Sequence, residues 1–218
     1  MKRLLIFSIK VLLSFIGVGA IVIVGILLLK NSPTETRVIE TKYTKTAVFS
    51  MGCFLTSQSV FFNRDSKIKY PGILSIRAGY ATGKITGSKS SEAKKRSIKV
   101  IYNPSIISYD QLLTIFWHNI DPFNPKGQFC DIGNEYTAAI FYTDHSQEMA
   151  AEHSKKRIEF QLSHKVVTPI LKLETFYDAE ERYQNFFTNN PLQHIYLKWR
   201  CNRDKPLNAI WGDVSYLN

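Results

Sequence analysis

The residues with the clearest chemical potential are Ser50-Met51-Gly52-Cys53-Phe54, where a cysteine follows an apolar strand and begins an expected helix. The unpaired N–H groups and the positive dipole end of a helix N-terminus favour a thiolate. Gly52 permits a tight turn and a close approach to a ligand. Cys53 is therefore a candidate nucleophile. The alternative is a buried, inert cysteine that only closes the strand.

The 218-residue chain has three cysteines, Cys53, Cys130 and Cys201. They are too few and too far apart for a disulfide scaffold or a CxxC zinc site. One reactive cysteine with one or two others that trap its oxidised form is a chemically sensible set. The alternative is that two cysteines pair for stability and the third is buried.

The N-terminal segment, residues 1–30, predicts a membrane anchor. Residues 11–29 carry no charge and would form a helix of roughly 28 Å, close to the thickness of a bilayer core. A cleaved signal peptide is the alternative, although the apolar run is long and no small-x-small site follows it. Because basic residues precede the span, we expect the body outside the cytoplasm, membrane-anchored or, after cleavage, secreted.

The net charge is +10, of which residues 1–30 supply four, leaving +6 for the remainder. No arginine-rich tract or basic helix accompanies this surplus, so we do not expect nucleic-acid binding. The densest basic cluster, Lys94-Lys95-Arg96, lies in an expected polar loop. A solvated basic surface explains such a pattern.

Residues 31–45 are polar and predict a linker, and residues 46–218 predict the folded domain. Alternating and apolar-faced patterns predict strands at 46–50, 73–80, 97–102, 136–142 and 166–173, and helices at 55–63, 112–119, 147–164 and 179–188. Ser108 with Gln111 is a candidate capping box, and Asp144 is a candidate helix cap. The C-terminal tail is expected to be irregular. The alternation favours an α/β sandwich.

Several co-linear segments resemble the peptide methionine sulfoxide reductase A family. Beside Gly52-Cys53-Phe54, the matching segments are Gly79-Tyr80, Val100-Ile101-Tyr102-Asn103-Pro104, Ile107-Ser108-Tyr109, Phe116-Trp117-His118-Asn119-Ile120-Asp121-Pro122, Gly127-Gln128-Phe129-Cys130-Asp131-Ile132-Gly133 with Tyr136, Val167-Thr168-Pro169-Ile170, Phe176-Tyr177-Asp178-Ala179-Glu180, Cys201-Asn202-Arg203-Asp204 and Ile210-Trp211-Gly212. They cover residues 46–213, nearly the whole expected domain.

The resemblance implies an α+β two-layer sandwich with a ferredoxin-like core and the reduction of methionine S-sulfoxide in oxidised proteins or peptides. In this family the cysteine matching Cys53 attacks the sulfoxide sulfur and becomes a sulfenic acid. A second cysteine forms a disulfide, which thioredoxin or a related thiol donor reduces. The resemblance implies no metal and no organic cofactor, and we expect a monomer held at the membrane by its N-terminal helix.

The resemblance also assigns the site. Tyr80 and Tyr136 match the family's two donors to the sulfoxide oxygen, and Asp131 matches its acidic partner. Each has an alternative role: Tyr80 as the cap of a strand end, Tyr136 as a packing residue at the start of a strand, and Asp131 as the cap of a turn. Phe54 and Leu55 are expected to bind the substrate methyl group.

The chain departs from the family pattern inside this site. Leu55 stands where the family has tryptophan, which removes a ring contact worth about 0.3–1.5 kcal/mol. Arg96 stands where the family has a proton-donating glutamate, and Glu92 is the nearby carboxylate that would replace it. An arginine can stabilise an oxyanion but cannot donate a proton near neutral pH.

A further departure is Thr56, where many relatives have a cysteine, so recycling falls to Cys201 or Cys130. Cys201 is favoured because the tail could reach Cys53, while Cys130 fits a structural role in the pocket loop. The leading interpretation is an outward-facing protein-repair reductase. The alternatives are a degenerate, non-catalytic module that binds methionine or methionine-sulfoxide segments, and a thiol redox enzyme acting on a different sulfoxide or disulfide.

Overall fold

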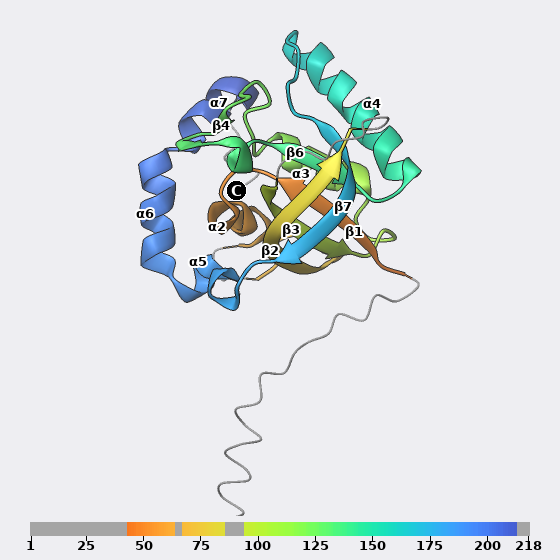
Figure 1. Ribbon diagram of the computed structural model, residues 1–218. Helices are drawn as coiled ribbons and strands as arrows, with labels where there is room; N and C mark the ends of the chain where they lie inside the picture. Colours follow the sequence, from red (N-terminus) through yellow and green to blue (C-terminus); the bar gives the residue numbers. More distant parts are fainter. Residues whose placement is uncertain (1–42, 64–66, 86–93, 213–218) are drawn as a thin grey trace, which may run out of the picture. The chain divides into compact units, whose positions relative to one another are not determined.

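The computed structural model describes residues 43–63, 67–85 and 94–212 (Figure 1). The expected anchor, most of the expected linker and Glu92 lie outside these ranges. Within them, the structure contains no helix with the length and apolar character needed to cross a bilayer.

Five strands close into a barrel in the order β1-β3-β2-β7-β6. They are β1 (Lys45–Ser50), β2 (Ile73–Lys84), β3 (Lys95–Tyr102), β6 (Ala139–Tyr142) and β7 (Ile170–Asp178). Strand β1 pairs antiparallel with both β3 and β6, which joins the two ends of the sheet (Figure 1). The expected mixed α/β fold is confirmed. The two-layer sandwich with a ferredoxin-like core is wrong as a description of this sheet, because the pairing of β1 on both sides closes the order of the described strands and leaves no edge strand among them.

The alternation of strand residues builds two apolar clusters. Ala47 and Phe49 of β1 belong to a large cluster that also contains residues of the covering helices. Val48 belongs to a second, smaller cluster with residues of β2, β6 and β7. Because successive side chains of a strand point to opposite faces, the covering helices and the strands themselves bury both faces of β1.

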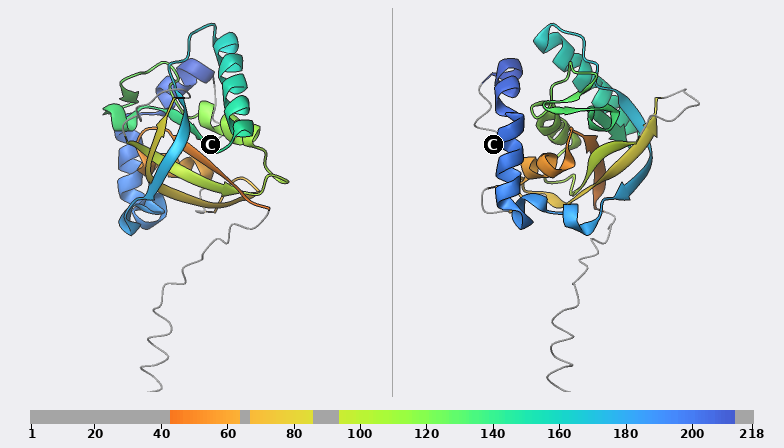
Figure 2. Two further views of the ribbon diagram at one scale, coloured as in Figure 1. Left: turned by 45° about the vertical axis from the view of Figure 1, so that its right-hand side comes forward. Right: turned by 60° about the vertical axis from the view of Figure 1, so that its left-hand side comes forward.

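Two helices cover the barrel, α3 (Tyr109–Trp117) and α4 (His145–Leu162) (Figure 2). Both expected caps are confirmed. Ser108 Oγ accepts the N–H of Gln111 at 3.2 Å, and Gln111 Oε1 accepts the N–H of Ser108 at 2.8 Å. Asp144 Oδ1 accepts the N–H of Gln147 at 2.9 Å. Helix α4 provides the crossover that the parallel pairing of β6 and β7 requires.

The C-terminal region is helical, so the prediction of an irregular tail was wrong. It forms α5 (Phe186–Asn189), α6 (Pro191–Cys201) and α7 (Asp204–Trp211), and α6 stands along the side of the domain in Figures 1 and 2. Pro191 occupies the first turn of α6, where its fixed φ suits a helix start, and Asn202 ends the helix in the left-handed region. The apolar residues Leu192 and Trp199 of α6 are exposed.

Shorter elements complete the site region. The expected helix over 55–63 is α2 (Phe54–Ser57) followed by the 3-10 turn η1 (Gln58–Phe61). The expected helix over 179–188 is η3 (Glu181–Tyr183) and α5. The loop between α3 and β6 contains the two-stranded pair β4 (Gly127–Gln128) and β5 (Asp131–Ile132), followed by η2 (Asn134–Tyr136).

Candidate active site

Cys53 lies in the turn between β1 and α2. Gly52 has a φ of +88°, and a Cβ at this position would lie 2.8 Å from Gln128 Cβ, so the turn requires glycine. Cys53 caps the N-terminus of α2, and its carbonyl accepts the N–H groups of Thr56 at 3.1 Å and Ser57 at 3.0 Å. The side chain of Cys53 is a free, half-buried thiol. The expected strand-to-helix position of this cysteine is confirmed.

The electrostatic environment of Cys53 opposes ionisation. Burial raises the pKa of the thiol above its ordinary value, and the charge of Asp131 raises it further. The N–H of Leu55 and the charge of Arg96 act in the opposite direction but do not outweigh burial. The start of α2 alone therefore does not produce a thiolate, contrary to the expectation from the sequence. A helix of four residues has only a small dipole to offer.

Strand register brings Tyr80 and Arg96 side by side. They are paired neighbours on the antiparallel strands β2 and β3. The end of β1 lies beside them, because Ser50 pairs with the residue that follows Arg96. Ser50 Oγ donates to the carbonyl of Arg96 at 2.9 Å and to the carbonyl of Thr137 at 2.7 Å. One buried hydroxyl thus fixes the segments that carry Cys53, Arg96 and Tyr136 relative to one another.

Aromatic rings line the site around Arg96. Phe54 is fully buried and packs edge-on against Tyr80, with ring centroids 5.5 Å apart. The guanidinium carbon of Arg96 lies 5.2 Å from the centroid of the Phe54 ring and 4.9 Å from that of Tyr136. Tyr183 contacts Phe54 as well, with centroids 5.8 Å apart. The sequence did not single out Tyr183 as a site residue.

Two further groups in this region were missed from the sequence. Glu135 Oε2 accepts a hydrogen bond from Arg96 Nε at 2.8 Å. Lys95 is buried, and its Nζ donates to Asn134 Oδ1 at 3.0 Å and to Thr137 Oγ1 at 2.7 Å. The interpretation of this basic cluster as a solvated loop was therefore wrong for Lys95. Strand alternation could have identified Lys95 as buried, because side chains of a strand that begins at Lys95 point alternately to opposite faces.

Asp131 lies at the same site on β5. Burial raises the pKa of its carboxyl group, and the charges of Arg200, Arg203 and Arg96 oppose this shift. The charge of Asp131 in turn acts on the Cys53 thiol. The structure therefore brings together Cys53, Tyr80, Asp131 and Tyr136, the residues expected to be catalytic.

The other two cysteines, Cys130 and Cys201, are joined in a disulfide across 71 residues of sequence. This bond connects the loop between β4 and β5 to the end of α6. Together with Asp131, the two sulfurs form a group of ligand-type atoms within 4.8 Å of one another. Because the sulfurs are bonded to each other, they are not free thiolates for a metal ion. The two candidates for recycling are thus paired, as the alternative of a stabilising pair also expects.

Arg203 is buried behind the site and was also missed. It donates to Thr56 Oγ1 and to the carbonyl of Asn119, each at 2.9 Å. Its guanidinium carbon lies 4.5 Å from the centroid of the Phe129 ring. Burial lowers the pKa of Arg203 to about 10. Since Thr56 Oγ1 also donates to the carbonyl of Cys53 at 3.0 Å, this arginine ties the C-terminal region to the nucleophile turn.

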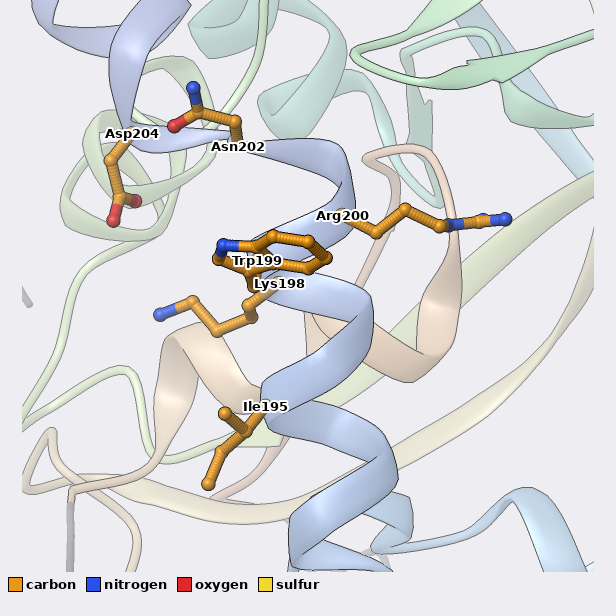
Figure 3. A pocket seen from close by; sticks show the side chains of 6 residues that line it. All are labelled: Ile195, Lys198, Trp199, Arg200, Asn202 and Asp204. Carbon is orange, nitrogen blue, oxygen red and sulfur yellow. The ribbon is translucent and has the colours of Figure 1, made fainter.

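A hollow of about 790 Å³ lies elsewhere, along α6 and the start of α7. Figure 3 shows its lining, which consists of Ile195, Lys198, Trp199, Arg200, Asn202 and Asp204. Cys53 does not line it.

Comparison with known proteins agrees with this geometry. The sequence model of peptide methionine sulfoxide reductase matches residues 45–214. The chain is 34% identical over 174 residues to peptide methionine sulfoxide reductase MsrA of Halalkalibacterium halodurans, covering 76% of this chain and 96% of that protein. It is 33% identical over 174 residues to the MsrA of Bacillus subtilis, covering 76% of this chain and 95% of that protein.

Solved structures agree in fold. Reduced Mxr1 from Saccharomyces cerevisiae matches with a TM-score of 0.61 and 23% identity, covering 72% of this chain and 92% of that chain. Methionine sulfoxide reductase A of Corynebacterium diphtheriae matches with a TM-score of 0.57 and 22% identity, covering 74% of this chain and 84% of that chain. The extent of the sequence match decides the assignment: the chain belongs to the peptide methionine sulfoxide reductase family.

Proposed function

We propose that Cys53 Sγ is the atom with which this protein attacks and reduces the methionine sulfoxide of its substrates. The family establishes the reaction class, which is methionine sulfoxide reduction and the repair of oxidised proteins. The observation that supports Cys53 is its place as the free thiol at a turn beside Tyr136, Asp131 and Arg96. The remaining cysteines are joined to each other.

In the reaction, an electron pair of Cys53 Sγ attacks the sulfoxide sulfur. Oxygen passes to Sγ, the sulfoxide sulfur is reduced by two electrons, and methionine leaves. The enzyme retains a sulfenic acid on Cys53. In this proposal the hydroxyl groups of Tyr80 and Tyr136 donate to the sulfoxide oxygen, where negative charge grows. Leu55, which is only partly buried, provides apolar surface for the methyl group, whereas Phe54, expected to share this role, is fully buried and packs against Tyr80 and Arg96.

Recycling uses the two other cysteines as a relay. One of them attacks the sulfenic sulfur of Cys53, releases water and forms a mixed disulfide. The other then attacks its partner in that bond, which frees Cys53 and leaves the disulfide between Cys130 and Cys201. This relay replaces the expectation that Cys201 acts alone. Cys130 is exposed, so an external dithiol can reach the bond.

A thioredoxin-like protein is the proposed reductant. Mxr1 from Saccharomyces cerevisiae has been crystallised in complex with Trx2. In this chain, transfer of two electrons from a dithiol protein to the disulfide between Cys130 and Cys201 completes the cycle. The reaction consumes one dithiol for each methionine formed, and no other cofactor enters this scheme.

The proposed site of action is outside the cytoplasm. Support comes from the uncharged run over residues 11–29 and the basic residues before it. The test is protease treatment of intact cells or spheroplasts that produce the full-length chain. Protection of the domain from external protease would contradict this proposal without affecting the chemistry.

Substitution of Cys53 tests the function. We expect the full-length chain, purified in mild detergent with dithiothreitol, to convert an S-sulfoxide peptide to its methionine form. Cys53→Ser should abolish this turnover, while Cys130→Ser should retain it when dithiothreitol reduces Cys53 directly. Turnover at the buffer rate by the unchanged chain would contradict the proposal.

A second candidate function is a non-catalytic module that binds methionine or methionine-sulfoxide segments. The observation in its favour is that Arg96, a cation that cannot donate a proton near neutral pH, lies at the site beside Tyr136 and is bound to Glu135. It predicts peptide affinity without turnover, equal in the unchanged chain and in Cys53→Ser. Isothermal titration with oxidised peptide, alongside the turnover assay, separates the two functions.

A further inference from the structure

We propose that Arg96, positioned by Glu135, binds the sulfoxide oxygen through its guanidinium group and stabilises the charge that grows there. The inference rests on the proposed function of Cys53. It assigns a catalytic role to an arginine where the family has a proton-donating acid. It also assigns a positioning role to Glu135.

The geometry of Arg96 carries the inference. Its guanidinium carbon lies near the rings of Phe54 and Tyr136, at 5.2 Å and 4.9 Å from their centroids. These rings flank the region in which the methyl group and the oxygen of the sulfoxide are expected. Arg96 also interacts electrostatically with Cys53 and with Tyr80. A fixed cation therefore lies among the groups that surround the reacting sulfur.

The hydrogen bonding of Arg96 leaves donors for a ligand. Nε donates to Glu135 Oε2 at 2.8 Å. Within the described part of the chain, the two Nη nitrogens make no hydrogen bond. The carbonyl of Arg96 is held by Ser50 Oγ at 2.9 Å, and the neighbouring Lys95 is bound to Asn134 and Thr137. The backbone is therefore fixed, and the carboxylate of Glu135 fixes one edge of the guanidinium.

The chemistry balances without a separate acid. A Cys53 thiol and a sulfoxide give a sulfenic acid and a sulfide. The thiol proton ends on the transferred oxygen, Sγ is oxidised by two electrons and the sulfoxide sulfur is reduced by two. Arginine supplies no proton. Its part is to stabilise the oxygen while the bond to the substrate sulfur breaks, as donors aimed at a developing oxyanion do.

Single-turnover kinetics test the role of Arg96. The full-length chain is reduced, freed of reductant and mixed with an S-sulfoxide peptide, and methionine formation is followed by rapid quench. We expect Arg96→Gln to lower the rate constant about 100-fold, the typical loss for an oxyanion donor. Arg96→Lys should fall in between, since it keeps the charge without the planar fork. Arg157→Gln, an exposed arginine of α4, should match the unchanged chain.

The outcomes separate this inference from the function on which it rests. If the unchanged chain is active and Arg96→Gln stays within about twofold of it, the arginine inference fails and the function stands. A faster reaction in Arg96→Glu would mean that the site needs an acid, and would also overturn it. If the unchanged chain forms no methionine, both the arginine inference and the proposed function are contradicted. If Arg96→Gln misfolds, guanidinium rescue of Arg96→Ala, compared with sodium chloride at equal ionic strength, decides instead.

A double-mutant cycle tests Glu135. We expect Glu135→Gln to slow the single turnover in the unchanged background but to have no further effect in Arg96→Gln, because it acts through the arginine. The loss should appear in the rate constant at saturating peptide rather than in affinity. Equal losses in both backgrounds would show a structural role for Glu135 and would contradict the positioning assignment.

Discussion

At Cys53, influences of opposite sign act on the pKa of one thiol. The start of α2 and the charge of Arg96 favour the thiolate, whereas burial and the charge of Asp131 favour the thiol, and burial is the largest influence. The raised pKa therefore favours the less reactive, protonated thiol form of Cys53. A protonated thiol also holds the proton that the transferred oxygen needs, so the raised pKa is compatible with the reaction.

The pKa of Cys53 gives a prediction for its pH dependence. Because that pKa is raised, the rate of alkylation by iodoacetamide should climb with pH to beyond the ordinary thiol value of 9.0 before it levels off. Asp131→Asn removes a negative charge and should move the midpoint to lower pH, whereas Arg96→Gln should move it to higher pH. The measurement uses the chain with its disulfide intact, so that Cys53 is the reactive thiol.

The exposed Glu152→Gln on α4 is the matched control for charge removal and should leave the midpoint in place. A midpoint that rises in Asp131→Asn would contradict the assigned sign of this interaction.

Leu55 provides a second prediction at the residue scale. It is partly buried and packs against the large apolar cluster. Leu55→Trp restores the ring of the family pattern and should lower KM for a methionine sulfoxide peptide by about 2- to 10-fold, with little change in kcat, given the strength of sulfur–aromatic contacts. Leu192→Trp, on the exposed side of α6, is the control. A lower kcat at unchanged KM would instead indicate that the larger ring disturbs the turn.

At the scale of elements, β3 does more than supply a barrel strand. It begins at Lys95, whose buried ammonium group holds η2 through Asn134 and Thr137. The next residue, Arg96, reaches into the site, and Ser97 pairs with Ser50 of β1. The first three residues of one strand therefore set the position of Tyr136, the cation and the nucleophile turn.

This role of Lys95 can be tested by substitution. Lys95→Met removes the donor to the buried hydroxyl oxygen of Thr137 and to the amide oxygen of Asn134, so we expect the free energy of unfolding to fall by about 1–3 kcal/mol. Urea denaturation, with the exposed Lys156→Met on α4 as control, measures this change. Activity should fall as well, because η2 carries Tyr136. Equal stability of the two variants would contradict a structural role for the buried lysine.

The sequence predicted most elements that have local signals. The capping residues Ser108 and Asp144 began helices as expected, because a cap needs only its own turn. The strand-to-helix place of Cys53 was likewise visible. Barrel closure and the pairing of Cys130 with Cys201 depend on distant segments, so nothing local indicates them. The α6 helix was missed because its apolar residues, such as Trp199, are exposed and mark no buried face.

At the scale of the whole molecule, the disulfide separates two tasks. In the proposed cycle the half-buried Cys53 meets the substrate, while the oxidising equivalents are carried to a bond that includes the exposed Cys130. The bond also joins the pocket loop to α6. The large peptide substrate and the large protein reductant therefore need not react at the same sulfur.

This separation predicts a stoichiometry. Without reductant, the fully reduced chain should form about two methionines per molecule, one to make the disulfide and one to leave Cys53 as a sulfenic acid. The chain with its disulfide already formed should give about one. Cys130→Ser and Cys201→Ser, fully reduced, should also give about one. Amino-acid analysis of the product measures these numbers, and a single methionine from the fully reduced chain would contradict the relay.

The closed barrel also affects how the protein meets partly unfolded substrates. Oxidised proteins are often partly unfolded and expose strands whose backbone N–H and C=O groups are unpaired. An open sheet would present unpaired N–H and C=O groups to such strands and could recruit them into aggregates. In this chain β1 bonds to a neighbour on each side, so each barrel strand of the described residues has a partner on both sides over at least part of its length. The closure of the barrel therefore limits the edge that it presents to the exposed strands of a damaged substrate.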